Sequence, residues 1–493
     1  MPGGSLAQRP NWPQVITEGG FVTTSPVQPA GTLILGDVTN GKLGTGTLGG
    51  DVTWSDLSVW VRSGSVTRPA TRQQGPLWSY QQGTASVTLN NADGRFDPDN
   101  LAGPYVAAGA TELNAMVPVR VRAMWNGVTY PLFWGFADAW TDNGVNYAGR
   151  YAETVLSATD AQKVLNGITL PAAGAVGAGE TSGARITRIL GAAMWYTGSA
   201  YRSVATGDST VQAYAGGDTA WNLMQVTADS EIGELYVSGS GQLVFRNRHA
   251  ILTDTRSNTP QAVFGDAPGT AEAAGTEVPY YQVPRARDDT TLANDIQATR
   301  VGGTLQEVQD AASVATYLFP RSYARTDLIL QNDSDALNWA QWVLYVSKQN
   351  EDRFDQLVIY PLRDPANLWP QVLGREIGDR IQVWRRPPGV ATPVTKDVFI
   401  RGIAHQWDWS AGTWQTTFTL QDASKYGSFL TLGNATLGKL GSNALAFLRR
   451  GNPCLFPSTS TARYSTPPTA TTTSCRSPRS SRPTRQSPPR RCW

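Results

Sequence analysis

Cysteine and histidine are scarce in this sequence, and both shortages restrict its chemistry. All three cysteines, Cys454, Cys475 and Cys492, lie in the last 43 residues. The preceding 450 residues therefore offer no disulfide, no thiolate nucleophile and no cysteine-bound metal. The two histidines, His249 and His405, are 156 positions apart. We expect no histidine-rich metal centre and little histidine acid–base catalysis.

Long apolar runs are also missing. No apolar stretch reaches the roughly 18 residues that a membrane-spanning helix requires. The segment from Met1 to Trp12 lacks a basic start followed by an apolar core, so no secretory signal is expected. We accordingly expect no stable membrane insertion.

The small net charge of +2 conceals two parts of opposite sign. Residues 1–450 contain 34 basic and 39 acidic residues, a net charge of −5, which does not indicate a nucleic-acid partner. Residues 451–493 contain seven Arg and no acid, and Pro, Ser, Thr and Arg fill 31 of these 43 positions. We expect this segment to be disordered. Binding of nucleic acid or of an anionic surface by its arginines stays open as an alternative.

Apolar and polar residues alternate toward both ends of the chain, which is typical of strands. The predicted strands are 56–61, 85–89, 117–124, 380–384 and 414–420. Helical spacing occurs in the middle and predicts helices over 161–165 after a cap at Asp160, 186–193, 220–227 after Asp218, and 335–348. Strands outside and mixed structure inside predict an α+β fold dominated by β, with roughly three domains of ordinary size.

One glycine-rich segment occurs twice, at 36–45 and at 433–442. Its first seven positions fit the phosphate loop G-x-x-x-x-G-K. Leu43 and Leu440 stand where Ser or Thr would contact magnesium, so both copies fail at the same position. We therefore predict structural glycine turns at these two segments.

The acidic segment Asn90–Asp99 resembles a calcium loop in composition. If Gly94 takes the sixth loop position, Leu89 becomes first and Asn100 twelfth, where Asp and Glu are needed. We predict a turn whose Asp and Asn side chains bond its own backbone, with Gly94 at positive φ. Calcium at an irregular site remains the alternative.

Two groups of carboxylates could suggest sugar hydrolysis: Asp138 with Asp142, and Asp408 between two tryptophans. The sequence does not fix how far apart such groups lie. His405 lies in a predicted strand, where a packed or hydrogen-bonded core histidine is the expectation. There is no G-x-S-x-G or H-E-x-x-H motif. We assign no catalytic, cofactor-binding or metal-binding residues, and we expect no cofactor and no enzymatic activity.

The order of the motifs resembles that of minor tail proteins from long-tailed (siphovirus-type) phages of actinobacteria. The matching segments are 83–98, 104–105, 117–122, 133–138, 154–160, 231–237, 241–248, 294–300, 374–383 and 414–422. They span roughly residues 50 to 450, and their order is more specific than any single motif.

This family is similar to the tail-tip, or baseplate, hub. The resemblance implies two tail-tube-like β-barrel domains formed from the two ends of the chain, with smaller α/β domains inserted between them. The implied divisions are 1–50 (N-terminal extension with the glycine-rich repeat), 51–156 (first barrel-like domain), 157–250 and 251–365 (inserted α/β domains), 366–430 (second barrel-like domain), 431–450 (glycine-rich repeat) and 451–493 (polar tail).

The function implied by the resemblance is structural. Such a hub closes the distal end of the tail tube, anchors tail-tip or fibre proteins and opens for DNA ejection. The implied partners are two further copies in a homotrimer, the distal tail protein and tail tube, the tape-measure protein, the tail fibre or other tail-tip proteins, and DNA transiently in the channel. The implied location is the distal end of the virion's tail, after synthesis in the host cytoplasm. The alternative is a tail-associated carbohydrate-binding or glycan-degrading protein.

Overall fold

The computed structural model describes residues 10–21, 54–72, 77–107, 109–142, 151–172, 174–196, 198–267, 271–272, 275–390 and 392–428. All of them belong to one unit within Met1–Ala446. Strands dominate and eight α-helices accompany them over these residues, which confirms the predicted α+β class. Both glycine-rich repeats, the three cysteines and the segment 451–493 lie outside the described residues.

The first part of the chain is built almost entirely of strands. Its elements are β1 (Gln14–Gly20), β2 (Trp54–Asp56), η1 (Ser58–Trp60), β3 (Val61–Arg68), β4 (Ala70–Arg72), β5 (Trp78–Tyr80), β6 (Thr84–Asn90), β7 (Val106–Ala107), β8 (Ala110–Thr111), β9 (Pro118–Trp125), β10 (Val128–Asp142) and β11 (Glu153–Thr159).

A mixed segment follows. Its elements are α1 (Ala161–Gly167), β12 (Thr169–Leu170), α2 (Ser182–Ala192), β13 (Arg202–Val204), β14 (Asp218–Thr219), α3 (Ala220–Glu231), β15 (Glu234–Val237), β16 (Leu243–Arg246), α4 (Ala250–Thr253) and α5 (Thr255–Asn258). Helices α1, α2 and α3 share one apolar core with β15 and β16. We call this part the first inserted unit.

Three short strands come next, β17 (Val263–Gly265), β18 (Ala271–Glu272) and β19 (Gly275–Pro279). They are followed by β20 (Arg285–Asp288), β21 (Asp295–Arg300), β22 (Gln306–Gln309), α6 (Ala311–Tyr317), β23 (Ser322–Leu328), α7 (Asp333–Ser347) and β24 (Glu351–Phe354). Helix α7 packs on the small sheet β22–β21–β23, with Ile296, Trp339 and Val343 in its core. We call residues 285–354 the second inserted unit.

The last described part returns to strands. Its elements are β25 (Gln356–Ile359), η2 (Pro361–Arg363), α8 (Pro365–Gly374), β26 (Arg380–Arg385), β27 (Val394–Asp408), β28 (Thr413–Asp422) and η3 (Ser424–Ser428).

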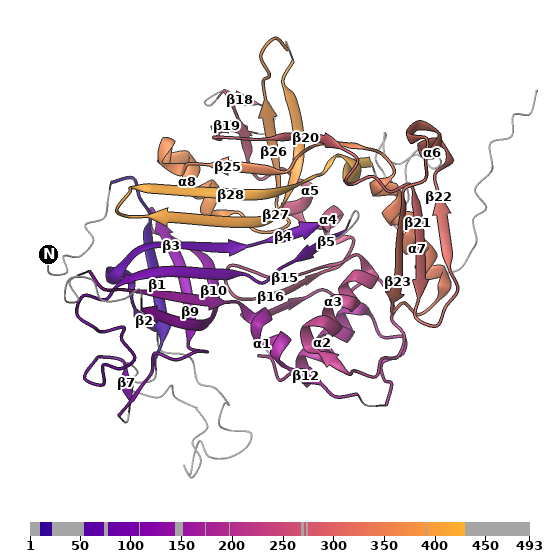
Figure 1. Cartoon of the computed structure of the whole chain (residues 1–493). Coiled ribbons are helices and arrows are strands. Elements are labelled where there is room, and N and C mark those ends of the chain that lie inside the picture. Colours follow the sequence, from indigo (N-terminus) through magenta and orange to yellow (C-terminus); the bar gives the residue numbers. More distant parts are fainter. Residues whose placement is uncertain are drawn as a thin grey trace, which may run out of the picture. The chain divides into compact units, whose positions relative to one another are not determined.

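A single 14-stranded sheet contains strands from both ends of the chain. Its order is β18-β19-β17-β26-β27-β3-β6-β11-β10-β9-β1-β2, and β28 joins it by pairing with β27 and β25. The connection between the ends is the antiparallel pair β3–β27, from Ile403↔Arg68 to Asp408↔Ser63 (Figure 1). Over the described residues the two groups of strands form this continuous sheet, and neither group closes into a separate barrel.

Because apolar and polar residues alternate along the strands, the apolar side chains lie on one face and pack together as a core. Val119, Val121 and Ala123 of β9 are fully buried, and so are Phe418 and Leu420 of β28 in the same apolar cluster. Burying each such Val, Leu or Phe side chain contributes about 1.5–3 kcal/mol. The strands predicted over 85–89, 117–124, 380–384 and 414–420 are confirmed.

The strand predicted over 56–61 is wrong. Strand β2 ends at Asp56, the short helix η1 follows, and β3 begins only at Val61. The Asp56 carboxylate accepts a hydrogen bond from the backbone N–H of Ser58 at 2.8 Å. Such a local side-chain bond offers the backbone an alternative to the ladder, so the chain turns here.

The predicted helices are all present, with small differences at their starts. Asp160 caps α1, because its carboxylate accepts from the Gln162 N–H at 2.9 Å. Helix α3 is capped by Thr219 and not by its neighbour Asp218. Helix α7 begins at Asp333, two residues before the predicted start.

Candidate functional site

A buried arginine connects the joined sheet to the first inserted unit. The register of β27 against β28 shifts between Ile400 and Gly402, so Arg401 occupies a β-bulge. Bulges redirect side chains, and Arg401 is only 3% exposed. Its guanidinium donates to Tyr80 Oη at 3.0 Å and to Gln421 Oε1 at 2.6 Å. It also forms an ion pair with Glu234 at the start of β15.

Glu234 is shared between two arginines. Its carboxylate also pairs with Arg246 of β16 at 2.8 Å, and Arg246 reaches Asp254 at 3.0 Å. Burial by itself would raise the pKa of Glu234, but the charges of Arg401 and Arg246 outweigh burial and hold that pKa below its usual range. Glu234 is thus an anion inside the protein, paired on both sides. This cluster joins the neighbouring strands β15 and β16 to β5 and β27, which lie far from them in the sequence.

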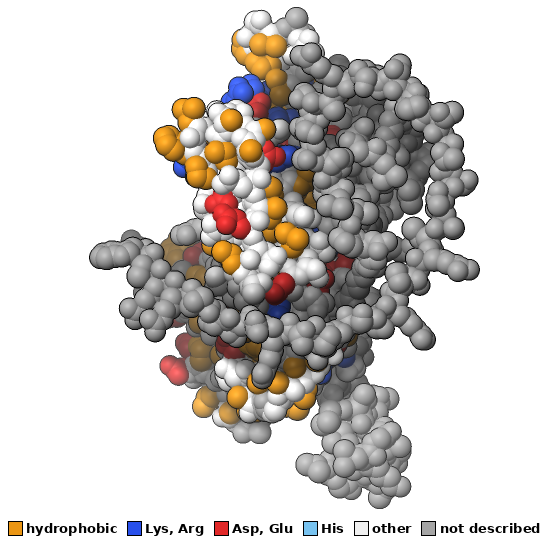
Figure 2. All heavy atoms as spheres, turned by 90° about the vertical axis from the view of Figure 1, so that its right-hand side faces the viewer, with side chains coloured by type: hydrophobic (Ala, Val, Ile, Leu, Met, Phe, Trp, Pro, Cys, Tyr) orange, Lys and Arg blue, Asp and Glu red, His pale blue; other side chains and the backbone are white. Residues whose placement is uncertain are grey.

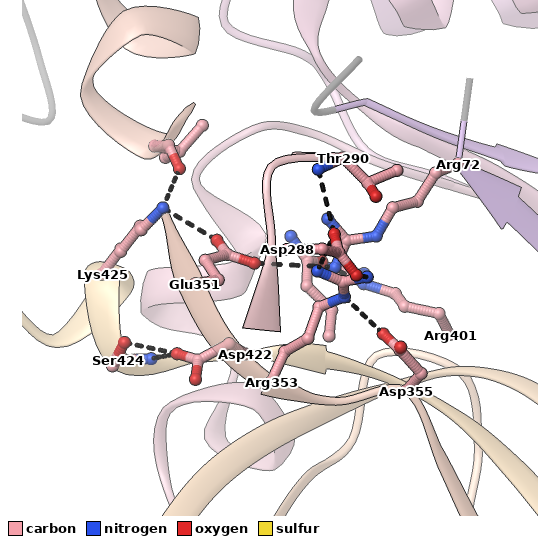
Figure 3. A network of polar contacts seen from close by, with 12 residues as sticks. Arg72, Asp288, Thr290, Glu351, Arg353, Asp355, Arg401, Asp422, Ser424 and Lys425 are labelled. Atoms are coloured by element: carbon pink, nitrogen blue, oxygen red, sulfur yellow. Dashed lines mark hydrogen bonds and ion pairs between the residues drawn. The ribbon is translucent and has the colours of Figure 1, made fainter. Parts of the chain in front are cut away.

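A second polar network joins the second inserted unit to the ends of the chain (Figure 3). Glu351 of β24 pairs with Lys425 of η3 at 2.8 Å and with Arg72 of β4 at 3.7 Å. Beside it, Arg353 pairs with Asp288 of β20 at 2.8 Å and with Asp355 at 2.7 Å. The three partners Arg72, Glu351 and Lys425 come from three separate elements, so the network holds these elements together.

A cavity of about 60 Å³ lies at the junction of these elements. A smaller one of about 10 Å³ shares the lining residues Val346, Gln421 and Tyr426 with it. We call the larger one the junction cavity.

Two titratable groups lie close to Arg68 at the end of β3. The carboxylate of Asp160 accepts from the Gly83 N–H at 2.7 Å, and burial raises the pKa of Asp160 to about 7. His405 Nδ1 lies 3.0 Å from Thr416 Oγ1, and burial together with the charge of Arg68 lowers its pKa to about 3. His405 is therefore a hydrogen-bonded core residue, as predicted.

The predicted self-bonded turn is also confirmed. The Asn91 side chain accepts from the Phe96 N–H at 2.8 Å, and Asp97 accepts from the Asp99 N–H at 2.9 Å. Gly94 has φ +68°, in the left-handed region that favours glycine. Within the described ranges, no group of three or more His, Cys, Asp or Glu side chains is arranged to hold a metal ion.

The carboxylates singled out in the sequence have structural partners. Asp138 accepts from Thr159 Oγ1 at 2.6 Å and pairs with Lys163. Asp142 lies four residues further along the same strand, which places the two Cα atoms about 13 Å apart.

The Asp408 carboxylate stabilises the turn between β27 and β28. It accepts hydrogen bonds from the backbone N–H groups of Ser410 at 2.8 Å and Ala411 at 2.9 Å. The preceding Trp407 is buried and stacks on Trp414, with ring centroids 5.3 Å apart. His249, the other histidine, lies 2.7 Å from Asp208 Oδ2 and packs edge-on against Trp342.

The sequence analysis missed the residues that form the junction: Arg401, Glu234, Arg246 and Glu351. One available signal was a charged residue directly beside apolar strand residues, as in Ile400-Arg401 and Glu234-Leu235. The identity of each partner was not available, because Arg401 and Glu234 are 167 positions apart.

The second inserted unit exposes several apolar side chains. Figure 2 views the side of the molecule that carries this unit and shows hydrophobic side chains gathered on it. Leu318 is 77% exposed and Phe319 70%, while Val301 and Leu305 are about half exposed. Leu318 ends α6 with φ +70°, an uncommon conformation for a residue with a side chain. Leu318 and Phe319 are neighbours in the chain, and adjacent exposed apolar side chains of this kind often mark contact surfaces.

Over the described residues, no helix combines the length and the apolar character that crossing a membrane requires. No protein-family model matches the chain, and no curated protein matches its sequence.

Several solved structures are similar to it in fold. One is a tail protein from Neisseria meningitidis MC58, with 12% identity, a TM-score of 0.48, and coverage of 76% of this chain and 95% of that one. Another is the 43 kDa tail protein of prophage MuSo2 from Shewanella oneidensis, with 12% identity, a TM-score of 0.46 and coverage of 84% and 98%. A third is the prophage tail protein gp18 from Listeria monocytogenes EGD-e, with 9% identity, a TM-score of 0.39 and coverage of 74% and 91%. All three are named as tail proteins.

Proposed function

We propose that this chain is a structural protein of a phage tail, and more specifically the hub at the tail tip. The observation that carries the proposal is the pairing of β3 with β27, which brings the two ends of the chain into one sheet with two α/β units inserted between them. This arrangement agrees with the order expected from the resemblance to minor tail proteins. The two groups of strands would then be the counterparts of the two barrel-like domains.

The hub would be a homotrimer. Three chains with two tube-like groups of strands each would match the six positions of a tail-tube ring. The sheet has open edges at β2 and β18 over the described residues, and cyclic closure would cover such edges. A net charge of −5 over residues 1–450 suits a channel through which polyanionic DNA passes without being held.

The partners proposed for the hub are other tail proteins. The trimer would close the distal end of the tail tube against the distal tail protein, hold the tape-measure protein, anchor a fibre or other tail-tip proteins, and open for DNA ejection. The exposed Leu318 and Phe319 support a contact between the second inserted unit and another protein. No enzymatic role is proposed.

The test is to locate and count the chain in virions. Cryo-electron microscopy of tails, with an antibody against residues 285–354 as a label, is expected to place three copies at the distal end. A label in the head or along the tube, or six copies per tail, would contradict the hub. Turnover of host cell-wall glycan by the purified protein that disappears on Asp138→Asn or Asp408→Asn would favour the glycan-degrading alternative. Binding of host glycan without turnover, with the label at a fibre tip, would favour the carbohydrate-binding alternative.

A further inference from the structure

One row of side chains crosses six neighbouring strands of the large sheet without a charge. In the register of the sheet each member lies opposite the next. From β28 through β27, β3, β6 and β11 to β10, the row consists of Gln415, Gln406, Ser65, Ser86, Ser157 and Ala139. Three of these side chains are exposed and three are half-buried. At the usual spacing between strands the row is roughly 24 Å long.

The rows on either side have the same character. One consists of Thr413, Asp408, Ser63, Thr88, Val155 and Thr141. The other consists of Thr417, Ala404, Thr67, Thr84 and Thr159. Over these described strands Asp408 is the one charged residue of the three rows, and its carboxylate is already held by the N–H groups of its own turn. We call the three rows the hydroxyl face.

The hydroxyl face lies on the side of the sheet that points away from the core. Successive side chains of a strand point to opposite faces, and the intervening residues Val66, Val87 and Leu156 are buried in the apolar cluster. The face therefore consists of short polar side chains that meet solvent over the described part of the chain.

Such a surface is unusual because of the charges that it lacks. Soluble proteins usually have charged side chains at about 25–35% of their surface positions. Strand propensity favours threonine, but it disfavours Lys and Glu only mildly. The same sheet does accept charges elsewhere, since Arg120 and Arg122 of β9 both pair with Glu18 of β1. The sheet structure alone therefore does not explain why the hydroxyl face is uncharged.

The composition of the hydroxyl face also argues against two ordinary kinds of contact. The cores of protein interfaces are enriched in aromatic residues, Met and Arg and depleted in Ser and Ala, so a tight contact with another protein is not favoured. Stable binding of nucleic acid requires Lys or Arg to neutralise phosphates, and the three rows contain neither. The face is suited to a polyanion that passes along it and is not held.

We propose that the hydroxyl face lines the channel of the hub, so that double-stranded DNA slides along it during ejection. This inference rests on the proposed function. Without cations on the face, no phosphate is neutralised and no counterions are released on contact. Hydroxyl and amide groups exchange hydrogen bonds with water, which keeps the surface wet. Both groups of strands contribute, because β27 and β28 come from one end of the chain and β3, β6, β10 and β11 from the other.

The first experiment measures what charge on this face does to DNA transfer. Virions are prepared with Ser65→Arg and Ser86→Arg together, and the matched control is Ser65→Gln with Ser86→Gln, which adds bulk without charge. Arrival of labelled DNA in host cells is followed over time after adsorption. The arginine pair is expected to slow transfer about tenfold relative to the glutamine pair, and added salt should relieve the delay, because phosphate contacts weaken with salt.

The second experiment locates the face in the assembled tail. All cysteines lie in the last 43 residues, so Cys454→Ser, Cys475→Ser and Cys492→Ser leave a full-length chain without thiols. Ser86→Cys then adds one thiol on the hydroxyl face, and Gln309→Cys on the exposed strand β22 is the control. After coupling to a small maleimide–gold cluster, cryo-electron microscopy of tails is expected to show the Ser86→Cys label inside the channel and the control label outside it.

Three results would overturn the inference. Equal transfer rates for the arginine and glutamine pairs would show that the face does not meet DNA. A Ser86→Cys label on the outside of the tail tip would show the same. A thiol that reacts in the purified Ser86→Cys chain but not in tails would make the face a contact between proteins. In these three cases the chain can still be found at the tail tip, so the proposed function survives. A chain absent from the tip overturns both. If the arginine pair does not assemble, the Ser86→Cys label decides.

Discussion

At the scale of single residues, this protein places charged groups in its interior and balances them within the chain. Arg401, Glu234 and Arg246 form a buried chain of alternating charge. Replacing such a set with apolar residues can be neutral, but removing one member leaves a buried charge without a partner. The cluster is therefore a sensitive place to test how the parts of the chain are connected.

Glu234→Gln is expected to lower the free energy of unfolding by about 3–5 kcal/mol, because it leaves Arg401 and Arg246 without their shared anion. Urea denaturation monitored by tryptophan fluorescence measures the change. The control is Glu307→Gln on the exposed edge strand β22, which should change stability by less than about 0.5 kcal/mol. Equal effects of the two substitutions would show that the buried cluster does not stabilise the junction.

His405 is expected to make the fold sensitive to acid. Its pKa is about 3 in the folded protein against an ordinary value of 6.5, so the unfolded state binds more protons between these values. The free energy of unfolding therefore decreases as pH falls from 6.5 toward 3. At pH 4 it is about 3 kcal/mol lower than at neutral pH because of this group. His405→Gln removes this contribution. The free energy of unfolding of the variant, relative to the wild type, should improve between pH 7 and pH 4, and parallel profiles would contradict the assignment.

Asp160 is expected to have the opposite pH dependence. Its folded-state pKa of about 7 lies above the ordinary value of 3.8, so the folded state retains a proton that the unfolded state has released. The retained proton stabilises the folded state below pH 4. As pH rises from below 4 to 7, the free energy of unfolding loses this contribution, which is about 4 kcal/mol. The side chain of the Asp160→Asn variant stays neutral at every pH, and its amide oxygen can still accept from the Gln162 N–H and cap α1. The second carboxylate oxygen, which accepts from the Gly83 N–H, becomes an NH₂ group, so that hydrogen bond is lost at every pH.

The measurement is the difference in unfolding free energy between Asp160→Asn and the wild type at a series of pH values. This difference should move in favour of the variant as pH rises from 4 to 7, whereas His405→Gln gains as pH falls. A difference that does not change with pH would mean that Asp160 is ionised throughout.

At the scale of elements, the pair β3–β27 depends on a residue without a side chain. A Cβ on Gly64 of β3 would lie 2.4 Å from Trp407 Cζ2 of β27. Trp407 is buried and stacked on Trp414, so it has little freedom to move aside. The close approach of the two strands at this point therefore requires glycine.

Gly64→Ala is expected to destabilise the protein by about 1–3 kcal/mol, the usual cost of overpacking a filled core. The matched control is Gly191→Ala in α2, where an added Cβ meets no atom within 4 Å. Alanine is the better helix former, so this control should stabilise the protein by up to about 1 kcal/mol. Thermal unfolding of the two variants should shift in opposite directions, and a neutral Gly64→Ala would show that the strands can separate locally.

At the scale of the whole molecule, the inserted units are tied to the sheet by polar contacts as well as by apolar cores. The Glu234 cluster ties the first unit, and the network of Arg72, Glu351 and Lys425 ties the second. Both lie beside the junction cavity, where residues of the two units and of the two chain ends line one space. A change in this region should therefore affect the connection of the units more than the cores within them.

A chain that ends at Arg450 is expected to fold and to keep its melting temperature. Residues 451–493 have no apolar period, and their seven arginines lack acidic partners within the segment. Differential scanning calorimetry of the full and shortened chains tests this. A lower melting temperature, or failure of the shortened chain to enter virions, would show that the segment contributes to folding or assembly.

Local patterns in the sequence determined much of the secondary structure. The alternation over 117–124 and 414–420 predicted β9 and β28, and helical spacing predicted α7, because side-chain period follows directly from backbone geometry. The cap at Asp160 and the turn around Gly94 were predictable for the same reason, since their partners lie within a few residues. The turn after Asp56 was missed, because a local hydrogen bond there prevailed over the alternating pattern.

The tertiary structure alone decided how distant segments meet. No local sequence pattern predicts that Arg68 lies opposite Ile403 in the sheet or that a β-bulge turns Arg401 inward. Nor does any pattern predict that Glu234 is the ion-pair partner of Arg401. The sequence also did not indicate that Trp78 and Arg248 would line one cavity. A periodic pattern tells which face of an element is buried, but the free energy that selects its partner depends on packing between residues hundreds of positions apart. The β-dominated class therefore followed from the sequence, whereas the joined sheet and its polar junction required the fold.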